Sequence, residues 1–220
     1  IQKCLKIKFQ NFLITIFGFI ENGNQQSVNQ MKILSVDDKD AIKTASKIIR
    51  AGGLIVYPTD TLYGFGVDSK NQSAINKINE IKKRNSPISV ICWSINIFSK
   101  WVEVSQDDLL KASSYLNESS TVILPVKKNI VHPSILGSDQ TLGIRMPQYP
   151  FPIDLCRELN LPITTTSVNE TASDPLNDPA LIIDKFGSKI DLIIDAGILP
   201  KSRGSKIYKL ENTKFIKIRS

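Results

Sequence analysis

The chain has 220 residues, with 28 Lys and Arg against 21 Asp and Glu, so its formal net charge is +7. Hydrophobic residues make up 41% and charged residues 22%, a composition typical of a soluble globular protein and unlike that of a disordered or fibrous chain. The single histidine, His132, argues against metal sites built from imidazole clusters and against Ser-His-Asp or Cys-His enzymes.

Net charge and cysteine content limit which classes of binding partner and which cellular compartment are expected. The isoelectric point near 9.3 favours polyanionic partners such as nucleotides or RNA. The cysteines, Cys4, Cys92 and Cys156, are widely spaced and form no C-x-x-C pair. We interpret them as reduced thiols and therefore expect a cytoplasmic protein.

Residues 1–30 carry a basic flank followed by an apolar run over residues 12–20. The run is far shorter than the ~20 residues that a helix needs to cross a bilayer, so we expect no membrane partner. Met31 stands immediately before the first well-patterned segment. We expect residues 1–30 to be disordered or not native, and residues 31–220 to form one domain; a signal peptide is the alternative.

From Met31 onward, strand-like and helix-like patterns alternate. A short strand at 33–34 precedes a helix that Asp37 caps and that ends at Arg50. A buried strand at 54–57 leads to a glycine-containing turn at 63–66 and a helix at 73–83. We then expect helices at 95–101, 107–116, 151–159 and 179–186, and strands at 88–92, 121–126, 141–146, 163–166, 191–195, 206–210 and 215–218. These elements predict an α/β or α+β fold with one open, mixed sheet flanked by helices.

Hydroxyl and carboxylate side chains gather after the strand at 54–57. Ligands of open α/β sheets bind beyond strand ends, so Thr59, Asp60, Thr61 and Tyr63 are suited to hydrogen-bond a small polar molecule. A capped turn explains the same residues without a ligand. The glycines that follow match no phosphate-binding loop.

Two cations, Lys82 and Arg84, stand where a predicted helix ends. They could converge on one triphosphate, although cations also favour helix C-termini for electrostatic reasons alone.

Arg145 lies among apolar residues, where it meets either a buried carboxylate or a bound anion. Ser167 and Asn169 end a buried strand and could donate to phosphate or ribose oxygens, or close a turn.

Taken in chain order, these motifs closely resemble the YrdC-like family. The order is P-T-D-T-L-Y-G-F-G, K-x-R, a strand beginning at Thr121, G-I-R-M-P, S-x-N, I-I-D-A-G and G-S, over residues 32–218. The resemblance implies an open, twisted mixed sheet around a basic cavity. It further implies a threonylcarbamoyl-AMP synthase, an enzyme that joins L-threonine, bicarbonate or CO2, and ATP, with Mg2+ as the expected ion. The product is used by a partner transferase to modify tRNA.

The resemblance also implies the site residues. Lys82 and Arg84 match the catalytic cations and, with Ser167 and Asn169, bind ATP. Ser205 is implied to contact the nucleotide. Thr61, Thr121 and Arg145 match the threonine pocket.

The chain departs from the family pattern in two segments. Residues 117–120 replace a P-G-P-x turn and add a carboxylate, and residues 170–172 end in Ala172 where the family carries a glycine that could adopt a positive φ.

Two other functions stay open at this point. One is a carbamoyl-adenylate-forming domain like that of hydrogenase-maturation proteins. The other is a non-catalytic or regulatory nucleotide- or RNA-binding protein, contacting tRNA or double-stranded RNA through scattered basic residues: Lys127, Lys128, Lys201, Arg203, Lys206, Lys209, Lys214, Lys217 and Arg219.

Overall fold

The computed structural model describes residues 31–85, 87–118 and 120–219. The expectations for residues 1–30, including Cys4, lie outside these ranges. The strands are β1 (Lys32–Ser35), β2 (Ile55–Pro58), β3 (Tyr63–Gly66), β4 (Ser89–Ile91), β5 (Thr121–Pro125), β6 (Thr141–Arg145), β7 (Thr164–Ser167), β8 (Leu192–Asp195), β9 (Ile207–Glu211) and β10 (Lys214–Arg219). The helices are α2 (Ala41–Arg50), α3 (Gln72–Lys82), α4 (Ile95–Trp101), α5 (Gln106–Asn117), α6 (Pro150–Leu159) and α7 (Pro179–Phe186), with single 3-10 turns at Pro133–Ile135, Ser138–Gln140 and Gly187–Lys189.

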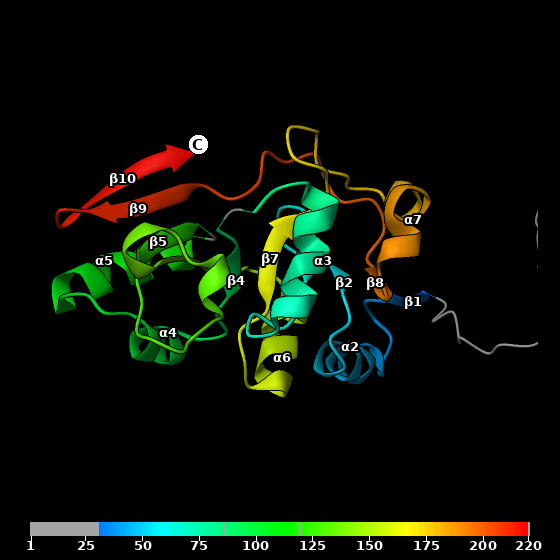
Figure 1. The fold of residues 1–220 in the computed structure, drawn as a ribbon, viewed down its shortest axis with the longest axis horizontal. Coiled ribbons are helices and arrows are strands. Elements are labelled where there is room, and N and C mark those ends of the chain that lie inside the picture. Colours follow the sequence, from blue (N-terminus) through cyan, green and yellow to red (C-terminus); the bar gives the residue numbers. More distant parts are fainter. Residues whose placement is uncertain (1–30, 86, 119, 220) are drawn as a thin grey trace, which may run out of the picture.

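All the strands join one mixed sheet in the order β1-β8-β2-β3-β7-β4-β6-β5-β9-β10 (Figure 1). Strand β8 pairs in parallel with β1 and β2, and β4 pairs in parallel with β6, whereas the neighbours of β7 run antiparallel to it. The predicted class, an α/β fold with an open mixed sheet and flanking helices, is confirmed.

The sheet is buried on both faces at β2 and β8. Successive side chains of a strand point to opposite sides, so each of these strands contributes residues to two cores. Ile55 and Tyr57 pack in a core with α2 and α6, whereas Val56 belongs to the larger core that includes α3, α4, α5 and α7. The core of α2 and α6 takes its sheet residues from β2, β4 and β8, together with Ile163 just before β7. On this same side of the sheet, the part over β6, β5 and β9 lies outside the core of α2 and α6 and lines a cavity.

The sequence located most elements, and α4 and α7 have the predicted bounds. The predicted cap at Asp37 is wrong: α2 begins at Ala41, after a turn in which Asp38 Oδ1 accepts the N–H of Asp40 at 2.8 Å. Local hydrogen bonds of this kind compete with helix formation, so the acidic run closes a turn first.

The predicted turn at 63–66 is also wrong, because these residues form the central strand β3. The buried ring of Tyr57 lies across its glycines: a Cβ on Gly66 would fall 2.5 Å from Tyr57 Cε1. Glycine here provides room for an aromatic ring on the neighbouring strand, which is one of the reasons that glycine occurs inside strands.

None of the helices within the described ranges is long and apolar enough to cross a membrane.

Candidate functional site

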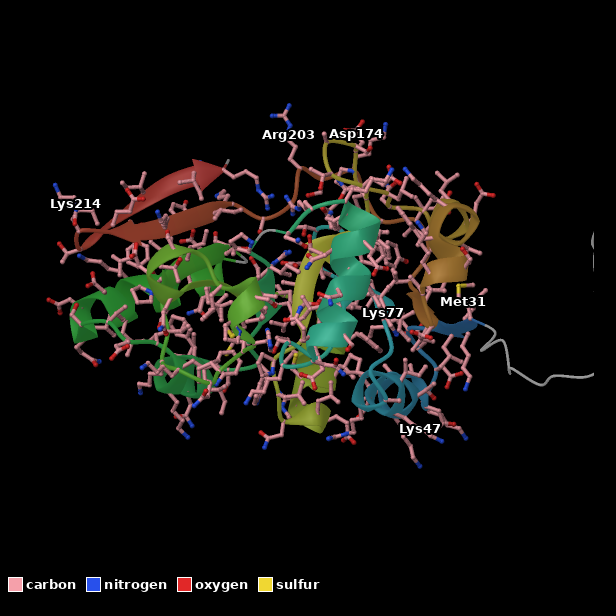
Figure 2. All side chains as sticks on the ribbon, in the orientation of Figure 1. Met31, Lys47, Lys77, Asp174, Arg203 and Lys214 are labelled. Atoms are coloured by element: carbon pink, nitrogen blue, oxygen red, sulfur yellow. The ribbon has the colours of Figure 1, made fainter. Side chains whose placement is uncertain are left out.

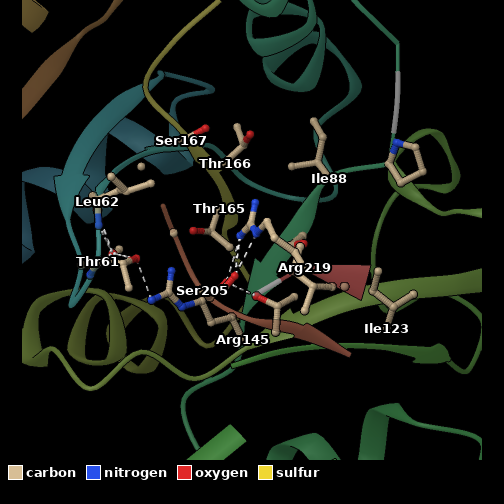
Figure 3. Close-up of a pocket in the computed structure, with 18 of the residues that line it drawn as sticks. Thr61, Leu62, Ile88, Ile123, Arg145, Thr165, Thr166, Ser167, Ser205 and Arg219 are labelled. Atoms are coloured by element: carbon tan, nitrogen blue, oxygen red, sulfur yellow. Dashed lines mark hydrogen bonds between the residues drawn. The ribbon is translucent and has the colours of Figure 1, made fainter. Parts of the chain in front are cut away.

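On the side of the sheet that packs against α2 and α6, the part over β6, β5 and β9 is not covered by these helices and forms the floor of a cavity of about 530 Å³ (Figure 3). Strand register aligns Thr165, Ser89, Gly143, Ile123 and Lys209 in one row across five strands. A Cβ on Gly143 would collide with Ser89 Oγ, so the glycine keeps this row flat. The floor therefore consists largely of small and hydroxyl side chains.

A second row brings two arginines into the same cavity. Arg145 pairs in register with Thr121, Thr121 with Ile207, and Ile207 with Arg219. Strict alternation along β10 would point Arg219 to the α5 side, where Phe215 packs against Tyr115. The register shifts between Lys217 and Arg219, and this bulge turns Arg219 toward the cavity.

The cavity is strongly basic. The described residues that line it include five cations and no Asp or Glu: Arg84, Arg145, Arg203, Lys209 and Arg219. Arg203 is exposed and projects beside the loop that carries Asp174 (Figure 2). Like charges facing one cavity repel each other, and a bound anion relieves that repulsion. The lining is suited to a ligand that carries several negative charges.

Arg145 is 6% exposed and is held by the segment that follows β2. Its Nη2 donates to Asp60 Oδ1 at 2.5 Å and to Thr61 Oγ1 at 2.9 Å. Burial lowers the pKa of Arg145, and the Asp60 carboxylate acts in the opposite direction. Nε is buried and has no partner among the described residues. The structure thus contains the buried ion pair considered for Arg145, and the same residue lines the cavity, so its binding of an anion stays a prediction.

Lys82 points into the protein. It is 3% exposed, and its Nζ donates to the Ser167 carbonyl at 2.8 Å and to Asn169 Oδ1 at 2.6 Å. Ser167 Oγ donates to the same Asn169 oxygen at 2.7 Å. Of these three residues, Ser167 lines the cavity. Lys82 and Asn169 thus hold the end of β7 in place from the side that faces away from the cavity.

Arg84 has the opposite position. It is exposed and lines the cavity, two residues beyond the helix that carries Lys82. Lys83 between them adopts a left-handed conformation (φ 52°) and ends α3. The two cations therefore have different surroundings. The guanidinium group of Arg84 lines the cavity, and the ammonium group of Lys82 does not.

Thr121 and Ser205 meet on the floor. Their hydroxyl oxygens lie 2.7 Å apart, and both residues line the cavity. Arg219 donates through Nε and Nη2 to the Ser205 carbonyl, at 2.9 and 2.8 Å. This bidentate contact joins β10 to the segment before β9.

The two departures from the family pattern have different consequences. In the first, Glu118 is exposed and outside the lining, and Thr121 still reaches Ser205. In the second, Ala172 has φ 67°, a conformation that favours glycine. Glu170 pairs with Lys83 at 3.1 Å, which lowers its pKa and ties this loop to the end of α3.

Sequence reasoning missed three lining cations, Arg203, Lys209 and Arg219, which it considered only as part of a possible phosphate-contacting surface for RNA. Their placement depends on strand register and on the bulge in β10. The hydroxyl of Tyr63, expected to face a ligand, donates to the Gly197 carbonyl at 2.8 Å and accepts the Ala196 N–H at 2.9 Å. No group of three or more His, Cys, Asp or Glu in the described ranges could hold a metal ion.

Comparison with known proteins agrees with the geometry. The family model of Sua5, YciO and YrdC, described as "Telomere recombination", matches residues 47–220. The threonylcarbamoyl-AMP synthase of Coxiella burnetii is 30% identical over 178 residues, which cover 78% of this chain and 93% of the relative.

Two solved structures share the fold. The crystal structure of Escherichia coli YciO superimposes with a TM-score of 0.74 at 25% identity, covering 86% of this chain and 93% of that one. Pyrococcus abyssi Sua5, solved in complex with L-threonine, superimposes with a TM-score of 0.76 at 24% identity, over 86% of this chain and 56% of its own length.

Proposed function

The chain belongs to the family of Sua5, YciO and YrdC, and from that premise we propose that it is a threonylcarbamoyl-AMP synthase using L-threonine, bicarbonate or CO2, and ATP. In this reaction the threonine amine adds to CO2 to give a carbamate. A carbamate oxygen then bonds to the α-phosphorus of ATP, and the bond from that phosphorus to pyrophosphate breaks. The observation that carries the proposal is the cavity itself, whose described lining has five cations and no carboxylate.

In this reaction the protein mainly positions the two anionic substrates and supplies positive charge near them. A carbamate and a triphosphate are both anions, so they repel each other as they approach. The cations that line the cavity offset that repulsion and stabilise the charge that moves onto pyrophosphate. No covalent nucleophile is needed.

Threonine binds at the end of the cavity formed by Arg145, Thr61 and Thr121. Arg145 Nε has no hydrogen-bond partner among the described residues, and a guanidinium is well matched to a carboxylate. The hydroxyls of Thr61 and Thr121 provide neutral hydrogen bonds beside it.

ATP binds along Arg84, Ser167 and Ser205. Arg84 is the catalytic cation that contacts the phosphates, and Ser167 and Ser205 provide hydroxyl donors at the lining. Lys82 and Asn169, assigned by the resemblance to the nucleotide, act through Ser167, because their polar atoms are committed to the protein. Arg219 keeps Ser205 in position and adds charge at the same end.

Mg2+ bound to the triphosphate would offset part of its charge. The described lining offers hydroxyl side chains such as that of Ser167 and no carboxylate, so phosphate oxygens of ATP and water would supply most of the ligands of the ion.

We also propose that the product passes to a transferase that modifies tRNA, and that the reaction occurs in the cytoplasm, where ATP and tRNA are available. Three lysines at or next to β9 and β10 that do not line the cavity support a contact with tRNA: Lys206, Lys214 and Lys217.

The test incubates the full chain with ATP, Mg2+, bicarbonate and each amino acid in turn, and follows pyrophosphate release. The adenylate is identified by mass spectrometry. We expect pyrophosphate only with L-threonine and bicarbonate together, and a product with the mass of threonylcarbamoyl-AMP.

Two other results would reject this function. Product with carbamoyl phosphate in place of threonine would indicate a carbamoyl-adenylate-forming enzyme. ATP binding without pyrophosphate from any amino acid would indicate a nucleotide-binding protein without turnover.

A further inference from the structure

Asp60 joins two connections that border the cavity. Its Oδ1 accepts a hydrogen bond from Arg145 Nη2 at 2.5 Å, and its Oδ2 accepts the backbone N–H of Gln148 at 3.2 Å. The first contact comes from the end of β6 and the second from the segment between β6 and α6. One carboxylate thus fixes both the guanidinium of Arg145 and the chain that follows it.

The segment that carries Asp60 is itself rigid. Thr59 Oγ1 donates to the Leu62 carbonyl at 2.7 Å and accepts the N–H groups of Thr61 and Leu62, each at 3.2 Å. This buried hydroxyl closes a tight turn between β2 and β3 that presents Asp60 and Thr61 together. Arg145 Nη2 accordingly finds two acceptors at fixed positions.

The ion pair is buried on both sides, with side-chain exposures of 8% for Arg145 and 14% for Asp60. Removing one partner of such a pair leaves the other charge uncompensated. Asp60 is outside the cavity lining, so it acts on a ligand through the residues that it holds, and of its two hydrogen-bond partners Arg145 lines the cavity.

We propose that Asp60 is a positioning residue that holds Arg145 so that its unused donors face the threonine carboxylate, and that it thereby sets the affinity for the amino acid and leaves the affinity for ATP unchanged. The inference rests on the proposed function. It deepens that function by separating the two substrates: the proposed ATP ligands Arg84 and Ser167 come from the α3–β4 connection and β7, and neither hydrogen-bonds Asp60.

The experiment measures KM for L-threonine, KM for ATP and kcat in the full chain and in Asp60→Asn and Asp60→Glu. Asp154→Asn is the matched control, because Asp154 pairs with Arg157 on the exposed surface of α6. We expect Asp60→Asn to raise KM for L-threonine at least tenfold and to change KM for ATP less than twofold. Asp60→Glu keeps the charge but displaces it, so it should raise KM for L-threonine by less than Asp60→Asn does, and Asp154→Asn should behave as the wild type.

Thermal unfolding identifies a variant that does not fold. If Asp60→Asn lacks a cooperative transition, Asp60→Glu alone carries the test, with the expected result of a raised KM for L-threonine and an unchanged KM for ATP. Equal increases in both KM values, or no increase for threonine in a folded variant, would overturn the inference. A wild-type chain that makes no threonylcarbamoyl-AMP would instead overturn the proposed function, and the inference with it.

Discussion

The ammonium group of Lys82 lies 2.6 Å from the side-chain oxygen of Asn169, although the two residues are 87 positions apart in the chain. Each acceptor of this lysine is a carbonyl, amide or hydroxyl oxygen of Ser167 or Asn169, and none is a carboxylate. Burial therefore lowers the pKa of Lys82 from 10.5 to about 8, and the charge of Arg84 acts in the same direction.

This pKa makes stability depend on pH. Between pH 8 and 10.5 the unfolded chain binds a proton at Lys82 that the folded chain has released, so raising the pH favours the folded state. The stability gained in this way is lost again as the pH falls through 8.

We expect the free energy of unfolding of the wild type to rise relative to that of Lys82→Met across this window, by at most about 1.4 kcal/mol per pH unit. Urea unfolding of both proteins at a series of pH values measures the difference. Other titrating groups are common to the pair and cancel. A difference that stays flat from neutral pH to above 10.5 would contradict the pKa assigned to Lys82.

Arg84→Ala should lower the rate of adenylate formation at least tenfold, because the variant loses about 1.4 kcal/mol or more of transition-state stabilisation at the phosphates. The side chain is exposed and makes no side-chain hydrogen bond in the described ranges, so thermal unfolding should be unchanged. Arg157→Ala, which removes an exposed arginine of α6, should keep full activity. Equal rates for the two variants would remove Arg84 from the site.

Ala172→Gly should stabilise the chain by about 1 kcal/mol. A non-glycine residue in the left-handed region costs roughly 1–2 kcal/mol, of which the greater flexibility of glycine in the unfolded state cancels a part. Ala180→Gly, on the exposed side of α7, should lower stability instead. Thermal or urea unfolding compares the two, and a loss of stability in Ala172→Gly would mean that its φ of 67° carries little strain.

Cys92 and Cys156 should resist alkylation in the folded chain. Both are fully buried, and burial raises the pKa of Cys92 to about 11 and that of Cys156 further still. Because the thiolate is the reactive form, iodoacetamide at pH 8 should leave both unmodified until the chain is unfolded. Peptide mass spectrometry measures each site, and rapid labelling of either one under native conditions would be inconsistent with this burial.

The sequence alone determined the alternation of helices and strands and the segments that carry the chemistry. Apolar periodicity and end signals are local, so α4 and α7 have the bounds that the pattern predicts. The ordered motifs in turn identified the family and the threonine and ATP residues that it implies. Where local signals competed, as at Asp37 and in the glycines of β3, the prediction was wrong.

Tertiary structure decided which of these residues share a surface. Asp60 and Arg145 are 85 residues apart, and only the order of the strands brings them together. The bulge in β10 turns Arg219 into the cavity against the alternation of its strand, and the packing of α3 against β7 commits Lys82 to the protein interior. Side-chain direction in a sheet depends on register with a distant partner, and burial of a charge depends on acceptors elsewhere in the chain, so neither can be read from a local pattern.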